Sequence, residues 1–340
     1  MALRVLLVND YKEYSGTERI LKILIEEARR HGDNFKLCVP VSSRQFKKTL
    51  MSFEPDIVDF HNIRRIGILP LLYSIDSGVP ICVTVHDYSL VCKNIHYFKY
   101  DGTNSVCQES DWSMCSRCPT LVKQNLPYPP KVFQFLKKRG VMLKTPSEAT
   151  RRVLVRFGYP EERVFTVYHG VPLRDEKTSD EGYILYIGSK VPIKGRHIAE
   201  RLSREMKQYK FVIVGSETGR AAYGEPGYVP EEELERLKRN CSLLLFPSLW
   251  LEPCGLVHLE TMRYKKVVVG FSLGAVPEYV RHSTVDSLEE MKLKIEEYME
   301  IPKLRRQHGL ENYNVVKERF TSSKMYERER SFYRRVLGEV

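Results

Sequence analysis

Short apolar runs alternate with stretches of helical periodicity along the first half of the chain. Such runs are typical of buried strands, and apolar residues spaced three or four apart are typical of helices. The expected strands are Val5–Val8, Phe35–Val39, Ile57–Phe60, Ile81–Val85, Val141–Leu143 and Val164–Val167. The expected helices are Thr17–His31, Arg44–Ser52, Ile66–Ile75, Pro130–Arg139 and Glu148–Phe157. Apolar strands separated by helices predict a parallel sheet covered on both faces.

The second half repeats this rhythm. Its expected strands are Tyr183–Ile187, Phe211–Val214, Ser242–Phe246 and Val267–Val269. Its expected helices are Arg196–Met206, Pro230–Arg239, Leu256–Tyr264 and Val276–Val280. After Asp286 the pattern is helical throughout, and the last expected helix is Ser322–Leu337.

The repeated rhythm predicts an α/β protein of two doubly wound, Rossmann-like domains with a cleft between them. A length of 340 residues accommodates two domains of ordinary size. The polar stretch Arg174–Gly182 has no apolar pattern and is the expected hinge, so the domains are expected at 1–172 and 173–321. Ligands of such sheets bind beyond the carboxyl ends of the strands.

Composition excludes some classes of protein. The chain is 42% hydrophobic and 29% charged, and no apolar run approaches the ~20 residues of a membrane span. The opening MALRVLLVND meets Asn9 and Asp10 at once, which indicates a buried strand and not a signal peptide. We therefore expect the protein in the cytoplasm.

The net charge of +11 is unevenly distributed. Residues 1–170 hold 25 Lys and Arg against 17 Asp and Glu, a balance of +8, and the remainder holds 29 against 26. A basic half could attract nucleic acid, anionic lipid or a phosphorylated substrate. No recognised nucleic-acid-binding module is present, so nucleic acid is an unlikely partner.

A basic cluster on one expected helix suggests a membrane contact. Arg44, Lys47 and Lys48 lie beside Phe46 and Leu50, a pattern that suits an anionic membrane surface. The protein would then be peripheral on the inner membrane face. An ordinary solvated helix face is the alternative.

The segment FPSLWLEPCGLVHLETMRYKKVVVGFSLGAVPEY, Phe246–Tyr279, carries the strongest functional signal. It predicts a strand, a loop with Glu252, a turn at Gly255 and a helix with Glu260. Amide N–H groups before a helix suit a diphosphate, and carboxylates on either side suit sugar hydroxyls. A nucleotide-sugar has this distribution of groups.

This segment resembles the Glu-x7-Glu donor motif of retaining glycosyltransferases of family four, which have the GT-B fold. The following SLGAVPEYV is similar to the family's GG-x-PE-x-V segment, with Gly274 and Glu278 in place. The resemblance implies that Glu252 contacts the transferred sugar and Glu260 the ribose. It also implies that Gly255, Leu256 and Val257 bind the donor through their amides. The alternative for Glu260 is a capping or pairing role on an amphipathic helix.

The resemblance carries implications for architecture and mechanism. It implies two domains that face each other across a cleft, with the acceptor on the N-terminal domain and the donor on the C-terminal domain. Residues 322–340 would form a helix that crosses back to the N-terminal domain. The mechanism would be front-face, with the leaving phosphate accepting the proton. No catalytic nucleophile and no cofactor for the chemistry would be required.

Two loops resemble the family's phosphate-binding segments. Gly16 stands in a loop similar to GG-x-E, in which Ser15 replaces the first Gly. Gly188, Lys190 and Lys194 fall in a segment similar to G-R-L-x-x-x-K-G, where Lys194 would neutralise the leaving diphosphate. Ser189 replaces the family's Arg. An ordinary strand–helix turn and a surface lysine are the alternatives.

Three histidines follow expected strands. His86, after the strand that ends at Val85, occupies the position of a family His that contacts the donor sugar, and we expect a catalytic role. His61 ends the preceding strand and is a candidate for the acceptor site. His169, in a segment similar to N-G-V, is expected to have a backbone or interdomain role. An isolated His at a strand end is often purely structural.

Four cysteines fall within the polar loop 88–125. Cys92, Cys107, Cys115 and Cys118 follow the pattern C-x14-C-x7-C-x2-C. Four thiolates with one C-x2-C suit a structural tetrahedral Zn²⁺ that braces a long loop. Two disulfides and free thiols are the alternatives.

Residues and resemblance together predict a retaining hexosyltransferase. It would transfer a sugar from a UDP- or GDP-linked donor to a glycan, a lipid-linked acceptor or a glycoprotein. The alternative is a non-catalytic module of the same fold that binds a sugar nucleotide or glycan, and Ser189 at the Arg position favours it.

Overall fold

The computed structural model describes residues 2–9, 16–40, 42–61, 67–103, 105–119, 129–174, 176–215 and 229–339. The chain divides into two compact units. The N-terminal unit contains residues 2–9, Gly16–His169 and the C-terminal residues from Ser322, and the C-terminal unit contains Gly170–Thr321. The loop residue Ser15 and the first residue of the expected helix Ile66–Ile75 lie outside the described residues.

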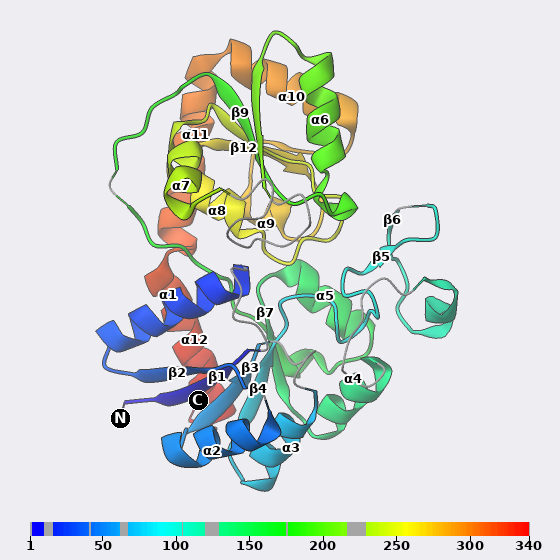
Figure 1. The fold of residues 1–340 in the computed structure, drawn as a ribbon, viewed down its shortest axis with the longest axis vertical. Helices are drawn as coiled ribbons and strands as arrows, with labels where there is room; N and C mark the ends of the chain where they lie inside the picture. The colour runs from blue at the N-terminus through cyan, green and yellow to red at the C-terminus, as the bar shows by residue number, and fades with distance from the viewer. Residues whose placement is uncertain are drawn as a thin grey trace. The chain divides into compact units, whose positions relative to one another are not determined.

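A six-stranded, fully parallel sheet forms the centre of the N-terminal unit (Figure 1). Its order is β2-β1-β3-β4-β7-β8. The strands are β1 (Arg4–Val8), β2 (Asn34–Cys38), β3 (Ile57–Phe60), β4 (Ile81–Thr84), β7 (Met142–Thr145) and β8 (Val164–Thr166). The β3 and β4 residues are all buried, as expected for strands that helices cover on both faces.

Among the described residues, six α-helices belong to this unit: α1 (Gly16–Arg30), α2 (Ser43–Phe53), α3 (Leu69–Asp76), α4 (Pro129–Lys138), α5 (Glu148–Arg156) and α12 (Ser322–Val336). The loop after β4 adds the hairpin β5 (Phe98–Lys99) and β6 (Ser105–Val106) and the 3-10 helix η1 (Ser113–Arg117). A second 3-10 helix, η2 (Glu161–Arg163), precedes β8.

The last helix packs within the N-terminal unit although the chain reaches it from the C-terminal unit. It lies beside α1. Ser322 Oγ donates to Glu27 Oε1 at 2.7 Å, and Tyr326 Oη donates to Asp33 Oδ2 at 2.5 Å. These buried bonds fix the register of α12 on the unit.

A buried network of charged side chains joins α12 to the centre of the sheet. Lys144 of β7 lies 2.8 Å from Asp59 Oδ2 of β3 and also pairs with Glu329 of α12. Tyr333 Oη donates to Asp59 Oδ2 at 2.7 Å. The side chains of Lys144, Asp59 and Glu329 are at most 1% exposed. Burial would raise the pKa of Asp59, but His61 and Lys144 hold that pKa well below its ordinary value.

The C-terminal unit has a five-stranded parallel sheet in the order β10-β9-β11-β12-β13. The strands are β9 (Tyr183–Ile187), β10 (Lys210–Val214), β11 (Leu243–Phe246), β12 (Val267–Phe271) and β13 (Thr284–Val285). The helical elements are η3 (Pro192–Lys194), α6 (Arg196–Glu205), α7 (Glu231–Asn240), α8 (Leu256–Met262), α9 (Val276–Tyr279), α10 (Leu288–Glu300) and α11 (Pro302–Arg319).

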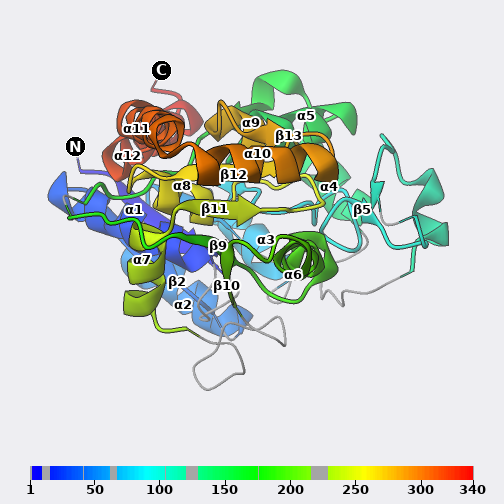
Figure 2. The same ribbon diagram turned by 90° about the horizontal axis from the view of Figure 1, so that it is seen from above.

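Alternate residues of β9, β11 and β12 face opposite sides of this sheet. Ile184, Leu243 and Val267 belong to one core cluster with residues of α6 and α10. Figures 1 and 2 show α6 and α10 over one face, while α7 and α11 lie on the opposite side in Figure 1. Apolar residues on both faces thus explain the two helical layers.

Both sheets have the same topology in their first strands. Each begins at an inner strand, adds the second strand on one side and then continues on the other. The order therefore reverses between β1 and β3 and between β9 and β11. Ligands of doubly wound sheets bind at such reversal points, beyond the carboxyl ends of the strands.

The predicted α/β class and the two Rossmann-like sheets are confirmed. The short elements β5, β6 and β13 were not predicted. The expected helix Ile66–Ile75 begins at Leu69 instead, because Pro70 occupies the first turn, where its missing N–H costs nothing.

The helix of the proposed membrane contact buries Phe46, Leu50 and Phe53, whereas Met51 is 68% exposed. Phe46 and Leu50 on α2 are 0% and 5% exposed, and the ring of Phe46 lies 6.0 Å from that of Phe60. These side chains form part of the core and do not present an apolar surface to a bilayer. Arg44, Lys47 and Lys48 are exposed. Within the described residues, no helix has the length and hydropathy needed to cross a membrane.

We predict that Lys144→Met destabilises the protein by about 3–5 kcal/mol, since it leaves Asp59 and Glu329 buried without a countercharge. Urea denaturation would measure the change. Lys324→Ala is the control, because the pair Lys324–Glu327 is about half exposed and should contribute less than about 1 kcal/mol. Equal stability of the two variants would contradict the structural role of the network.

Candidate active site

The reversal point of the C-terminal sheet brings two charged side chains together. Lys194 follows β9 at the end of η3, and Glu252 follows β11. Because β9 and β11 are parallel neighbours, the loops after them leave the same edge of the sheet. Lys194 Nζ lies 3.1 and 3.0 Å from the two carboxylate oxygens of Glu252.

The two loops are locked together by their backbones. Leu249 N donates to Ile193 O at 2.8 Å, and Tyr186 Oη donates to Lys194 O at 3.1 Å. Gly195 has a φ of 71°, and a Cβ there would lie 1.9 Å from Pro247 O. Only glycine allows this approach, so Gly195 permits the loops to dock and Lys194 to reach Glu252.

Two side chains of its own loop donate hydrogen bonds to the carboxylate of Glu252. Ser248 Oγ and Trp250 Nε1 donate to Glu252 Oε2 at 3.0 and 2.8 Å. The Nζ of Lys194 also lies 4.9 Å from the centre of the Trp250 ring, within cation–π range. Burial would raise the pKa of Glu252, but Lys194, Trp250 and Ser248 lower it below its ordinary value. Glu252 is therefore an ionised acceptor at neutral pH.

The segment after β12 contacts the backbone of Glu252. Ala275 N donates to Glu252 O at 2.8 Å. Gly274 has a φ of 59°, and a Cβ there would lie 2.3 Å from Glu252 N. The glycine of the GAVPE segment thus lets the backbone of the second loop press against that of the first.

Gly255 makes the turn into α8. Its φ is 73°, and a Cβ would lie 2.7 Å from the ring of His258. His258 is fully buried, and its ring nitrogens have no hydrogen-bond partner among the described residues. Burial lowers the pKa of His258 to about 4, so it is a neutral ring packed against Phe246 and Tyr279. Leu256 and Val257, the other residues expected at this turn, are half-buried.

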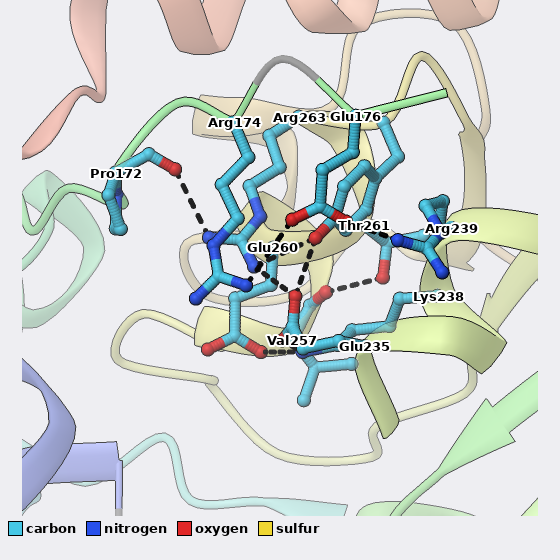
Figure 3. Close-up of polar contacts among 11 residues, drawn as sticks. Pro172, Arg174, Glu176, Glu235, Lys238, Arg239, Val257, Glu260, Thr261 and Arg263 are labelled. Atoms are coloured by element: carbon cyan, nitrogen blue, oxygen red, sulfur yellow. Dashed lines mark hydrogen bonds and ion pairs between the residues drawn. The ribbon is translucent and has the colours of Figure 1, made fainter. Parts of the chain in front are cut away.

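Glu260 on α8 lies in a second charge network, which Figure 3 shows. Lys238 of α7 is 2.8 Å from Glu260 Oε2 and also pairs with Glu235. Glu235 pairs with Arg263, and the Oη of Tyr264 donates to it at 2.7 Å. Glu260 thus pairs with Lys238 of another helix.

This network also contacts Pro172, Arg174 and Glu176, where the chain enters the C-terminal unit. Arg263 donates to Pro172 O at 3.1 Å, and Glu176 lies between Arg174 and Arg239 (Figure 3). Burial would raise the pKa of Glu235, but the neighbouring cations Lys238 and Arg263 lower it to about 2. Two carboxylates and two cations therefore balance one another, and Glu260 is held in one orientation.

The remaining predicted donor residues lie at the start of α1 and in the loop after β9. Gly16 is the first residue of α1. Gly188 follows β9 directly, and a Cβ there would lie 2.3 Å from the hydroxyl of Tyr186. Lys190 is exposed and Ser189 half-buried, and neither is part of the Lys194–Glu252 contact.

The three predicted histidines form a row at the carboxyl edge of the N-terminal sheet. His61 Nδ1 is 2.8 Å from His86 Nε2, and His86 Nδ1 is 3.4 Å from His169 Nε2. His61 and His169 are buried, and His86 is half-buried. His61 Nε2 lies 3.0 Å from Asp59 Oδ2. His61, expected to face an acceptor, is thus enclosed between Asp59 and His86.

The four loop cysteines lie in one neighbourhood as free thiols. Cys115 is close enough to Cys92, Cys107 and Cys118 for each to raise its pKa, although burial is the larger cause and the pKa is about 11. Among the described residues, the one group of three ligand side chains whose atoms all lie within 4.8 Å is His282, His308 and Glu311, and it contains no cysteine.

Several residues of these sites were not predicted. Lys238 is separated from Glu260 by 22 positions on another helix, so only the fold brings them together. Asp59 and Lys144 did leave a signal, since Asp59 is a charged residue inside the otherwise apolar β3 and Lys144 directly follows the apolar Met142 and Leu143 in β7. Such residues are buried only when they are paired.

Two family profiles match the chain. Residues 10–175 match Glycosyltransferase Family 4, and residues 174–314 match Glycosyl transferases group 1. The two doubly wound domains have the GT-B fold. The chain combines a Glycosyltransferase Family 4 domain with a Glycosyl transferases group 1 domain. No curated protein sequence matches the chain.

Solved structures of low sequence identity share the fold. A glycosyltransferase from Rickettsia africae ESF-5 has 12% identity and a TM-score of 0.70, with all of both chains covered. Anabaena HepE in complex with UDP-glucose has 15% identity and a TM-score of 0.68 over 97% of this chain and 99% of that one. AviGT4, involved in avilamycin A biosynthesis, has 14% identity and a TM-score of 0.61 over 99% of both.

We predict that Gly195→Ala destabilises the protein by at least about 2 kcal/mol more than Gly182→Ala. Both glycines have positive φ, 71° and 74°, so both variants bear the left-handed strain of about 1–2 kcal/mol. Only position 195 adds a collision with backbone, since nothing lies within 4 Å of a Cβ at Gly182. Urea denaturation of both variants measures the difference, and equal losses would rule out loop docking as the reason for Gly195.

Proposed function

We propose that this protein transfers a hexose from a nucleotide-diphosphate sugar to a hydroxyl acceptor with retention of anomeric configuration. The observation that carries the proposal is the Lys194–Glu252 pair at the reversal point of β9 and β11. It combines a cation for a diphosphate and an ionised carboxylate for sugar hydroxyls at the edge where doubly wound sheets bind ligands.

The exposure of the pair suits ligand binding. The side chain of Lys194 is 33% exposed, whereas that of Glu252 is 7% exposed. An anionic ligand can therefore reach the ammonium group while Ser248 and Trp250 continue to hold the carboxylate. Lys194 would stabilise the charge that develops on the leaving diphosphate, and Glu252 would orient the sugar.

Retention follows from a front-face displacement, in which the leaving phosphate oxygen accepts the proton of the attacking hydroxyl. This step requires charge stabilisation and positioning but no side-chain nucleophile. Cys254, the thiol near Glu252, is a poor candidate for one because burial raises its pKa to about 12. Glu260, held by Lys238, would accept from the ribose hydroxyls.

The donor is proposed as a UDP-sugar, because Anabaena HepE, of the same fold, has been solved with UDP-glucose. GDP-sugars are the alternative. A glycan, a lipid-linked saccharide and a glycoprotein are the acceptor classes to compare. The exposed Arg44, Lys47 and Lys48 would add electrostatic attraction if the acceptor lies on an anionic membrane.

We predict that Lys194→Ala and Glu252→Gln each lower turnover of the preferred UDP-sugar at least tenfold, because each removes a group that positions or stabilises the donor. Arg201→Ala is the control, since Arg201 pairs with Glu205 on the exposed face of α6. A radiolabelled-sugar transfer assay with thermal unfolding of each variant measures both activity and folding. Near-normal turnover of both site variants would refute the site.

A binding module without transfer is the second candidate, and Ser189 at the position of the family's Arg favours it. Slow donor hydrolysis distinguishes the two, because an enzyme of this class releases UDP from UDP-glucose without acceptor and a pure binding protein does not. A thermal-shift screen of nucleotide-sugars would identify the ligand in either case.

The cysteine cluster is proposed to hold one structural Zn²⁺. Burial raises the pKa of Cys92 and Cys107, but backbone N–H groups of Asn94 and Glu109, two residues beyond each, act to lower it. Such N–H groups stabilise metal-bound thiolates. The Nδ2 of Asn94 also lies 3.5 Å from the Sγ of Cys118. Bound zinc would draw the sulfurs together and brace the loop, with no part in the reaction.

We predict about one equivalent of zinc per chain in protein purified without chelator, measured by plasma emission spectroscopy. Cys115→Ser should lower the zinc content and the melting temperature of the protein, whereas Cys254→Ser should leave the zinc content unchanged. Metal-free protein with four titratable loop thiols would exclude the site.

A further inference from the structure

Three side chains that can bind a metal converge in the C-terminal unit, where the segment before β13 meets α11. His282, His308 and Glu311 each bring one ligand atom to within 4.8 Å of the others. His282 lies two residues before β13, and the other two residues lie on α11. Two imidazoles and one carboxylate form a ligand set that suits Zn²⁺ and disfavours Mg²⁺ and Ca²⁺.

The packing of α11 fixes two of the ligands. His308 and Glu311 are three positions apart on this helix, so they share one of its faces. Gly309 lies between them, and a Cβ there would lie 2.2 Å from Lys265 O in the turn before β12. The glycine thus allows α11 to approach the backbone closely, and this approach sets the position of both ligands relative to β12.

The third ligand is fixed by its neighbour in the chain. Ser283 follows His282 directly and is 1% exposed. Its Oγ donates to Val268 O, and its carbonyl oxygen accepts from Gly270 N at 3.2 Å. Both contacts are with β12. His282 and the two ligands of α11 therefore meet because their segments pack against the same strand.

Further hydrogen bonds orient the ligands. The Oη of Tyr298, which is fully buried, lies 2.9 Å from His308 Nδ1. Gln307 Nε2 donates to Glu311 Oε1 at 3.2 Å, whereas Glu311 Oε2 contacts His282 Nε2. These contacts leave His308 Nε2 and Glu311 Oε2 for a metal. Metal ligands in proteins usually have such outer partners, which fix the orientation of the ring or carboxylate.

The cluster can adjust to the geometry of zinc. Each ligand atom of a tetrahedral site lies about 2 Å from the ion, so two ligand atoms are about 3.3 Å apart. Starting from a spread of at most 4.8 Å, the atoms would move by about 1.5 Å. The side chains of His282 and Glu311 are 37% and 39% exposed, so they can rotate without disturbing the core. The same exposure lets water occupy the fourth position.

We propose that His282, His308 and Glu311 bind one Zn²⁺, with water as the fourth ligand, and that this ion joins the segment before β13 to α11. The site goes beyond the proposed transferase function and does not depend on it. An exposed site of three ligands exchanges its metal with the buffer. This zinc is therefore expected when zinc is added, beyond the equivalent proposed for the cysteine cluster.

Isothermal titration of tag-free protein with zinc chloride tests the site. Wild-type protein purified without chelator should bind one zinc ion beyond any that it retains. His282→Asn and Glu311→Gln should each weaken this binding at least about tenfold, because each removes a ligand. His197→Asn is the control and should bind zinc like the wild type, since His197 is exposed on α6. Equal affinity of all four proteins, or no added binding by the wild type, would overturn the proposal and leave an ion pair between His282 and Glu311.

Cobalt titration distinguishes this site from the cysteine cluster. Thiolate-bound Co²⁺ has an intense near-ultraviolet charge-transfer band, whereas Co²⁺ bound to imidazoles and a carboxylate has only weaker visible bands. The spectrum of the wild type minus that of His282→Asn should contain the visible bands alone. A charge-transfer band in this difference spectrum would assign the metal to the cysteines and overturn the proposal, as would the absence of any difference.

Thermal unfolding controls for misfolding of the variants. Without added zinc, His282→Asn and Glu311→Gln should melt close to the wild type, because both side chains are partly exposed. Added zinc should raise the melting temperature of the wild type more than that of either variant, since a metal that binds the folded state stabilises it. Equal shifts would contradict the site. None of these measurements uses a sugar nucleotide, so failure of the metal site and failure of the proposed transferase function are distinguishable.

Discussion

Burial of a single ionised carboxylate is the constraint on which the C-terminal site depends. An unpaired buried charge is strongly unfavourable, so Glu252 can remain ionised only while Lys194, Ser248 and Trp250 converge on it. Two of these donors come from the same loop as Glu252, but Lys194 comes from the loop after β9. The docking of that loop, through the close approach of Gly195 to Pro247, is therefore a condition for the ion pair.

The core of this architecture follows from the sequence because the central strands are apolar on both faces. Runs such as Leu243–Phe246 are typical of a parallel strand that helices cover on both faces. The missed strand β13 has only two residues and lies between Ser283 and Asp286, so it has no periodicity to detect. It forms because β12 offers a free edge beside it.

Lys194 and Glu252 were expected at one donor site because of the family resemblance. Lys194 and Glu252 lie in short loops whose glycines and prolines constrain them, and the structure brings these two side chains together. Glu260 differs, because its contact with Lys238 depends on how α7 and α8 pack. The pairing of Lys144 with Glu329 likewise depends on tertiary structure, since the two residues are 185 positions apart. Sequence periodicity does not contain such long-range pairings.

Two lysines illustrate how exposure separates structure from function. The side chain of Lys144 is 1% exposed and pairs with two buried carboxylates. Both of its anionic partners therefore belong to the protein itself. Lys194 holds one buried carboxylate at 33% exposure, which leaves its ammonium group accessible to an incoming anion. A reaction at Lys144 would require α12 to separate from the sheet, because Lys144 joins the two through Glu329. Chemistry at the second requires only that a diphosphate share a cation that the loops have already positioned. The same ion-pair chemistry therefore stabilises the N-terminal unit and, in our proposal, binds the donor in the C-terminal unit.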